Sequence, residues 1–203
     1  MSGYFFRDAF FTILILAVPG TTSATATSLT EVGYKVTSGT VTFLAIGRPG
    51  FLRINGEGGK PTGHFTVDSG HSKLTSGEIL VNLEAFGTGL PLRDRHMREK
   101  YLETKTFPDA VFKAAPLAFK DGKLPGETDL KGSLTLHGVT KPITANVKVN
   151  GAAKNASLTE AEIEADFEIV LSDFKVAIPE YAGVTVAEKV KVHISFQTRT
   201  ENQ

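Results

Sequence analysis

The chain contains no cysteine and no tryptophan, and it has no excess charge of either sign. Without cysteine no disulfide can form, so the fold must be stabilised by packing alone. Basic and acidic residues each number 22 in a chain of 203 residues. Nucleic-acid-binding proteins normally have a basic excess, so nucleic acid is not expected as a partner. The length suits one domain with a substantial core.

Motifs typical of catalysis or of metal binding are also missing. There is no HExxH, CxxC or G-x-S-x-G pattern, and the glycines at positions 56, 58 and 59 do not precede a helix as a nucleotide-binding loop would. His64 and His71 lie seven residues apart with only Asp68 nearby, and we interpret them as solvated surface residues. The sequence therefore predicts no catalytic residue, no metal site and no required cofactor.

The N-terminal segment differs from the rest of the chain. Arg7 precedes a run of ten apolar or small residues from Ala9 to Val18, and small residues follow as far as Ala26. A charged start, an apolar stretch and an A-x-A site predict a signal peptide over residues 1–26. Ten such residues are too few to span about 30 Å of hydrocarbon. We therefore expect residues 27–203 to form a single exported domain, periplasmic or secreted.

Apolar and polar residues alternate through most of the remaining chain. The clearest runs cover residues 130–136, 143–149, 163–171 and 190–196, and two earlier runs, at 32–36 and 41–45, are separated by Ser38-Gly39. A period of two is typical of antiparallel strands with one buried face. About eight or nine runs, joined by turn signals such as Gly58-Gly59 and Lys60-Pro61, predict a mainly β fold, either a sandwich or an up-and-down barrel.

Small residues occur on the apolar face of three of these runs. Gly132, Ala145 and Ala165 stand among leucine, valine and phenylalanine. They could leave room for an elongated apolar ligand, or larger side chains opposite could fill the space. The pattern alone does not decide between these alternatives.

Residues 90–112 interrupt the alternation with a concentration of charge. We expect a short helix here, beginning near Asp94 and ending before Phe107-Pro108. In a functional interpretation, Arg93 and His96 meet the polar head group of a ligand and Asp94 orients one of them. In a structural interpretation, Asp94 caps the helix and Arg93 pairs with an acid. His137, in a Leu-His-Gly segment, is expected to be a turn residue rather than a ligand.

Three ordered motifs resemble those of the YceI family. They lie at residues 92–97 (LRDRHM, followed by Tyr101-Leu102 and Phe107-Pro108), at 132–143 (GSLTLHGVTKPI) and at 172–176 (SDFKV). The sequence differs from the family pattern in an insertion at residues 47–58 and in Lys175, where the family has glycine. The resemblance implies an extended, lipocalin-like, antiparallel eight-stranded barrel with a helical insert. It also implies that an apolar tunnel binds a polyisoprenoid such as a polyprenyl quinone or phosphate.

Two functional hypotheses follow. The first is an exported carrier that sequesters a polyisoprenoid, a quinone or a similar amphiphile, with contacts from Arg93, Asp94, His96, Phe112, Leu134, Ala145 and Phe167. The alternative is a hydrolase or isomerase acting on an amphiphile, with His96 as base and Asp94 as its orienter. A homodimer, and transient contact with a membrane or a membrane redox protein, stay open.

Overall fold

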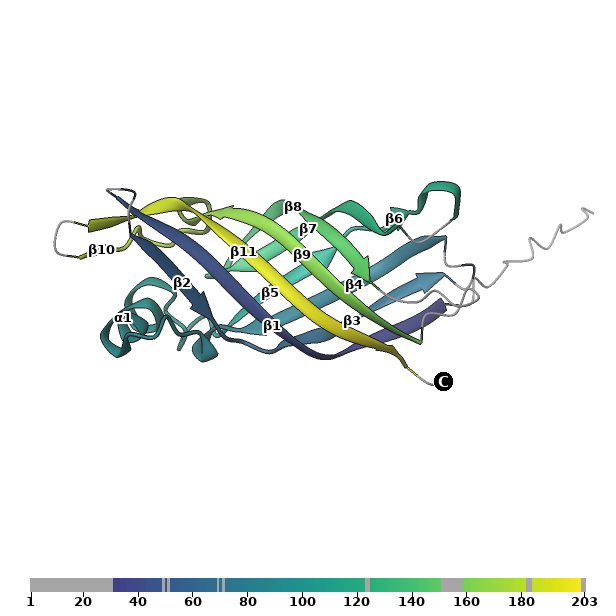
Figure 1. Cartoon of the computed structure of the whole chain (residues 1–203), viewed down its shortest axis with the longest axis horizontal. Coiled ribbons are helices and arrows are strands. Elements are labelled where there is room, and N and C mark those ends of the chain that lie inside the picture. The colour runs from purple at the N-terminus through teal and green to yellow at the C-terminus, as the bar shows by residue number, and fades with distance from the viewer. Residues whose placement is uncertain are drawn as a thin grey trace, which may run out of the picture.

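The computed structural model describes residues 31–201, except 49, 51, 69, 71, 123–124, 151–158 and 182–183. The expected signal peptide and His71 lie outside the described residues. The described chain forms an elongated antiparallel barrel with one short helical region at one end (Figure 1). In the part of the chain that the structure describes, no helix is long and apolar enough to cross a membrane.

Eight strands form the wall of the barrel. They are β1 (Glu31–Arg48), β3 (Pro61–Asp68), β4 (Lys73–Asn82), β5 (Asp109–Ala114), β7 (Glu127–Leu136), β8 (Val139–Asn150), β9 (Glu160–Val170) and β11 (Val184–Thr200). Neighbours in the order β11-β9-β8-β7-β5-β4-β3-β1 pair antiparallel, and β1 pairs with β11 to close the ring. The predicted eight-stranded antiparallel barrel is therefore confirmed. Three short strands pair beside it, β2 (Arg53–Glu57), β6 (Leu117–Ala118) and β10 (Glu180–Tyr181).

Strand β1 is longer than the alternation suggested. The runs at 32–36 and 41–45 belong to one 18-residue strand, so the expected break at Ser38-Gly39 is wrong. Val36 and Val41 are five residues apart and would face opposite sides of a regular strand. A register shift between Val36 and Ser38 changes the alternation by one residue. Both valines are therefore buried in the same core.

The partner strand of β1 is broken at residues 58–60. The second half of β1 pairs with β2, and its first half pairs with β3, so both short strands run alongside it. Gly58 has φ 138°, and a β-carbon there would overlap the backbone of Ala85. The turn signals at Gly58-Gly59 and Lys60-Pro61 therefore do not mark a hairpin, as their spacing suggested, because this segment separates two strands that run in the same direction. The insertion at residues 47–58 includes β2.

A helical insert lies beside this break. It contains the 3-10 turn η1 (Leu83–Ala85), the helix α1 (Pro91–His96) and a π-helical turn η2 (Met97–Tyr101). Paired hydrogen bonds of 3.0 and 2.9 Å between Glu57 and Gly87 attach the insert to β2. The helix starts at Pro91, three residues before the expected Asp94. Proline suits the first position of a helix, because its missing N–H would have no partner there. It ends before Phe107-Pro108 as predicted.

Two further 3-10 turns complete the fold, η3 (Lys120–Gly122) and η4 (Leu171–Phe174). The β7–β8 hairpin turns at His137 and Gly138, whose φ values are 49° and 71°. Positive φ at both central residues is the geometry of the tight turns that suit the twist of a hairpin. The prediction that His137 is a turn residue is confirmed.

Candidate ligand cavity

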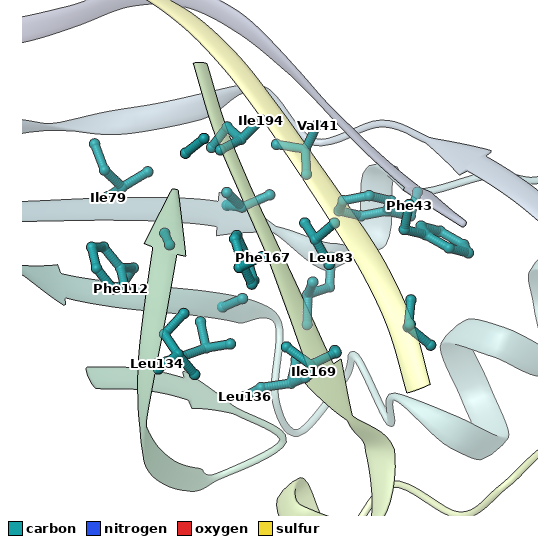
Figure 2. Close-up of a pocket in the computed structure, with 18 of the residues that line it drawn as sticks. Val41, Phe43, Ile79, Leu83, Phe112, Leu134, Leu136, Phe167, Ile169 and Ile194 are labelled. Carbon is teal, nitrogen blue, oxygen red and sulfur yellow. The ribbon is translucent and has the colours of Figure 1, made fainter. Parts of the chain in front are cut away.

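A cavity of about 780 Å³ runs along the inside of the barrel (Figure 2). This volume lies within the range of about 300–1,000 Å³ that is typical of small-molecule sites. The lining is apolar and comes from every strand of the wall; it includes Val41, Phe43, Ile79, Phe112, Leu134, Phe167 and Ile194. Alternation explains the apolar lining, because every second residue of each strand points inward.

Four of the apolar residues expected to contact a ligand lie together in this lining. Phe112 and Leu134 are paired across β5 and β7, and their side chains lie side by side in Figure 2. Ala145, on β8, and Phe167, on β9, also line the cavity. The structure thus brings these four residues into one cavity, and their contact with a ligand stays a prediction.

The small residues of the inner face behave differently from one another. Ala145 and Ala165 line the cavity, so their small size leaves space within it. Gly132 does not, because the ring of Phe112 lies where a β-carbon of Gly132 would be. At Gly132 the second alternative is therefore correct, since a larger side chain on the adjacent strand fills the gap.

The cavity reaches solvent beside α1. The lining residues that are exposed are Leu90, Pro91, Leu92 and Glu180, and all lie at the end of the barrel where α1 and β10 are found (Figure 1). We call this end the mouth. The half-buried side chains of Arg93, His96 and Tyr101 also line the cavity there.

The opposite end of the barrel has a different lining. Leu74, Leu117, Phe119 and Pro125 line the cavity there, and among the lining residues described at this end only Thr128 is polar. Beside them Tyr34 stacks on Phe65, with ring centroids 5.1 Å apart. Burial raises the pKa of the Tyr34 phenol, which favours its neutral form. We call this region the apolar end. The cavity as a whole is thus amphipathic along its length.

A hydrogen-bond network at the mouth is centred on Thr88. The Arg93 guanidinium donates to the Thr88 hydroxyl at 2.6 Å and to its carbonyl at 2.8 Å. The Asp94 carboxylate accepts from the Thr88 N–H at 2.7 Å and from its hydroxyl. Partial desolvation raises the pKa of Asp94, but these hydrogen bonds and the nearby Arg98 and Arg93 charges outweigh it, so its pKa lies below the ordinary value.

This network corrects the structural interpretation of the insert. Asp94 does not cap α1, because Leu90 occupies the cap position and no side chain bonds there. Arg93 braces the helix through Thr88 rather than through an acid. Asp94 lies outside the cavity lining, and its carboxylate bonds Thr88. Among the described residues, no hydrogen bond joins Asp94 to His96 in the way that a base and its orienter would require.

One further hydrogen bond lies within the insert, and another contact fastens it to the barrel. Arg98 donates to the Phe86 carbonyl at 2.8 Å, which joins η2 to the segment that follows η1. His137 contacts the Glu103 carboxylate at 2.6 Å and the Phe174 carbonyl at 3.3 Å. The sequence showed the turn at His137 but not this tie to the insert.

Two residues of the mouth were not predicted from the sequence. Thr88 lies between two glycines, and no periodic pattern marks it. Glu180 belongs to a two-residue strand, which is too short to show alternation. Neither segment carries a signal from which its place at the cavity could have been found.

Comparison with known families and curated proteins gives consistent matches. The model of the YceI-like domain matches residues 25–198. Proteins named YceI from Salmonella arizonae and Salmonella newport are each 33% identical over 116 residues, which is 56% of this chain. The match spans 59% of the length of each of these relatives.

Solved structures show the same fold. BcnA from Burkholderia cenocepacia superimposes with a TM-score of 0.63 at 18% identity, over 78% of this chain and 95% of that one. A polyisoprenoid binding domain from Saccharophagus degradans, described as implicated in plant cell wall breakdown, gives 0.62 at 16% identity, over 83% and 98%. The YceI protein of Campylobacter jejuni gives 0.56 at 19% identity, over 74% and 86%. At these identities the likeness establishes the fold.

Proposed function

The chain belongs to the YceI family, and from this membership and the shape of the cavity we propose that the protein carries a polyisoprenoid, a polyprenyl quinone or a similar amphiphile. The observation that supports this most is the distribution of polarity in the cavity. Ionisable side chains line the mouth, and the described lining of the rest is apolar apart from Thr128. An amphiphile with a compact polar head and a long apolar tail has the same distribution.

Burial of the tail supplies the binding free energy in this proposal. Each buried methylene contributes about 0.8 kcal/mol, so each isoprene unit contributes a few kcal/mol. The neighbour from Saccharophagus degradans, which is described as a polyisoprenoid binding domain, has the same fold. A carrier of this kind requires no catalytic group and no cofactor.

The head group is placed at the mouth in this proposal. Arg93 and His96 line the cavity there and carry donors for a phosphate or a quinone carbonyl oxygen. Asp94 does not contact the ligand directly. It holds Thr88, which in turn holds the Arg93 guanidinium, so its role is to position Arg93.

Export is part of the same proposal. Residues 1–26 would direct the chain across a membrane and be removed, leaving residues 27–203 as one lipid-binding domain in the periplasm or outside the cell. N-terminal sequencing of the protein purified from its host tests this. A mature chain that begins near residue 27 supports export with cleavage, and an intact N-terminus contradicts it.

The ligand can be identified by solvent extraction of protein purified from its native host, followed by mass spectrometry. The extract should contain an isoprenoid lipid or a quinone in near-stoichiometric amount. Ala145→Phe and Ala165→Phe place a ring in the cavity and should abolish uptake while the fold is retained, as circular dichroism would show. Thr144→Phe is the matched control, because Thr144 is exposed on the same strand. Unchanged uptake in both cavity variants would rule out a ligand along these faces.

A further inference from the structure

The rim of the mouth carries the exposed large apolar side chains of the described chain. These are Leu90, Leu92 and Ile178, which are 55%, 47% and 43% exposed. Large apolar side chains gathered at one end of a protein indicate an interaction site more strongly than the same residues scattered over its surface. Here they surround the opening through which an amphiphile would enter.

The charge around the mouth divides into two sides. Residues 90–105, the helix side, include five basic and three acidic side chains, a net charge of plus two. Residues 172–188, the β10 side, include one basic and three acidic side chains, a net charge of minus two. Figure 1 shows α1 and β10 on opposite sides of this end of the barrel. Leu90 and Leu92 thus lie in a basic segment and Ile178 in an acidic one, although Arg48 of β1 lies close to Ile178 beside Glu180 and Glu188.

Apolar and basic groups occur together on the outer face of the helix side. Leu92 and Arg95 are three residues apart on α1, so they share a face, and both are exposed. Lys100 is also exposed, whereas Arg93 and Arg98 are held by Thr88 and by the Phe86 carbonyl. The Lys100 ammonium lies 5.4 Å from the centre of the Tyr101 ring and stays exposed. Leucines that can enter the acyl boundary, next to exposed cations that can meet lipid phosphates, are the combination that binds interfacially to anionic membranes.

We propose that the helix side of the mouth docks onto the surface of an anionic phospholipid bilayer, with Leu90 and Leu92 entering the interface and Arg95 and Lys100 on the phosphates. The inference rests on the proposed function, because an amphiphile of this kind resides in a membrane and must leave it to enter the cavity. Docking by this side places the opening against the bilayer. The acidic β10 side faces away.

Vesicle sedimentation tests the proposal without any isoprenoid. The purified protein should sediment with vesicles of phosphatidylcholine and phosphatidylglycerol, and much less with phosphatidylcholine alone, and added salt should weaken binding because the cations are exposed. Leu90→Ser/Leu92→Ser should weaken binding by roughly tenfold or more. Arg95→Gln/Lys100→Gln should weaken it about fivefold for each charge removed.

Ile178→Ser is the matched control, since it removes a large apolar side chain of similar exposure from the acidic side. It should leave sedimentation unchanged. Binding that is equal in the wild type and in both double variants, absent in the wild type, or lost equally in Ile178→Ser would overturn the proposal. A wild-type dimer that dissociates in Leu90→Ser/Leu92→Ser, seen by light scattering without vesicles, would also overturn it and assign this rim to a second copy of the chain.

Failure of docking can be distinguished from failure of the carrier function. Protein that yields an isoprenoid on solvent extraction but never sediments with vesicles is a carrier without this docking surface. Protein that sediments but yields no lipid retains the docking surface and contradicts the carrier function. Thermal unfolding of each variant verifies that the substitutions, all at exposed positions, leave the fold intact.

Discussion

The two ends of the barrel share one wall but are built by different interactions. At the apolar end, Tyr34, Val67 and Leu74 form a buried cluster in which Tyr34 stacks on Phe65. At the mouth, hydrogen bonds from Arg93 and Arg98 to Thr88 and Phe86 hold the insert together, and the insert packs on the barrel through buried Phe86 and half-buried residues such as Leu102. The comparison indicates that an apolar cluster stabilises one end, while the other adds hydrogen bonds within the insert and is open to solvent.

Matched leucine truncations should separate the two ends most strongly. Leu74→Ala removes a buried side chain at the apolar end and should lower the free energy of unfolding by about 2–5 kcal/mol. Leu102→Ala, at the half-buried packing of the insert, should cost clearly less. Urea unfolding of both variants measures the difference. Equal losses would show that the insert is packed as firmly as the apolar end.

Two aspartates with lowered pKa values, one at each end of the barrel, allow the two ends to be compared through the pH dependence of stability. Hydrogen bonds from the Ser72 hydroxyl, Lys73 N–H and Ser72 N–H lower the pKa of Asp68 at the apolar end, despite an opposing desolvation cost. The pKa of Asp94 at the mouth is also lowered. A lowered folded-state pKa stabilises the protein above the ordinary value and loses that effect as the pH falls through the folded-state value.

Asp94→Asn should therefore lower the free energy of unfolding at neutral pH by roughly 1 kcal/mol, and the difference from wild type should shrink as the pH falls below the ordinary aspartate value. For Asp68→Asn we expect a pH dependence of the same sign. Ligand affinity should fall only in Asp94→Asn, because only Asp94 positions Arg93 through Thr88. Urea unfolding across this pH range, with ligand titration at neutral pH, measures both. An equal loss of affinity in Asp68→Asn would contradict the assignment of the head group to the mouth.

The smallest effect is expected at the tie between the insert and the β7–β8 turn. His137→Gln removes the contact with Glu103 and should cost roughly 0.5–1 kcal/mol. Amide hydrogen exchange should accelerate in residues 91–107 and stay unchanged at the apolar end. His193→Gln is the control, because His193 pairs with Asp166 at an exposed position on the wall. Faster exchange at both ends would show that His137 supports the whole barrel.

Much of the wall could be predicted from the sequence, because a period of two reveals which side chains face inward. Phe112, Leu134, Ala145 and Phe167 were identified in this way and by family resemblance, and all four line the cavity. A period of two does not reveal a register shift within a strand, so the sequence pattern predicted two strands in place of β1. It also cannot show what lies opposite a small residue, as the Phe112 ring over Gly132 demonstrates.

The mouth was less predictable because its geometry depends on non-periodic segments. The charged insert was recognised, but its internal network around Thr88 depends on hydrogen bonds that composition and spacing do not specify. Leu90 and Leu92 could be recognised as a possible contact surface only once the fold placed them at the opening of the cavity. Residues 58–60 likewise carried a turn signal that did not distinguish a hairpin from a break between β2 and β3.

The central claim is that one amphiphile occupies the barrel with its head group at the mouth and its tail toward the apolar end. An experimental structure of the protein purified from its native host, with its lipid retained, tests this most directly. We predict head-group oxygens within hydrogen-bonding distance of Arg93 or His96 and a tail that extends past Ala145 toward Leu117. A head group at the Leu117 end, or a lipid bound outside the barrel, would contradict the account.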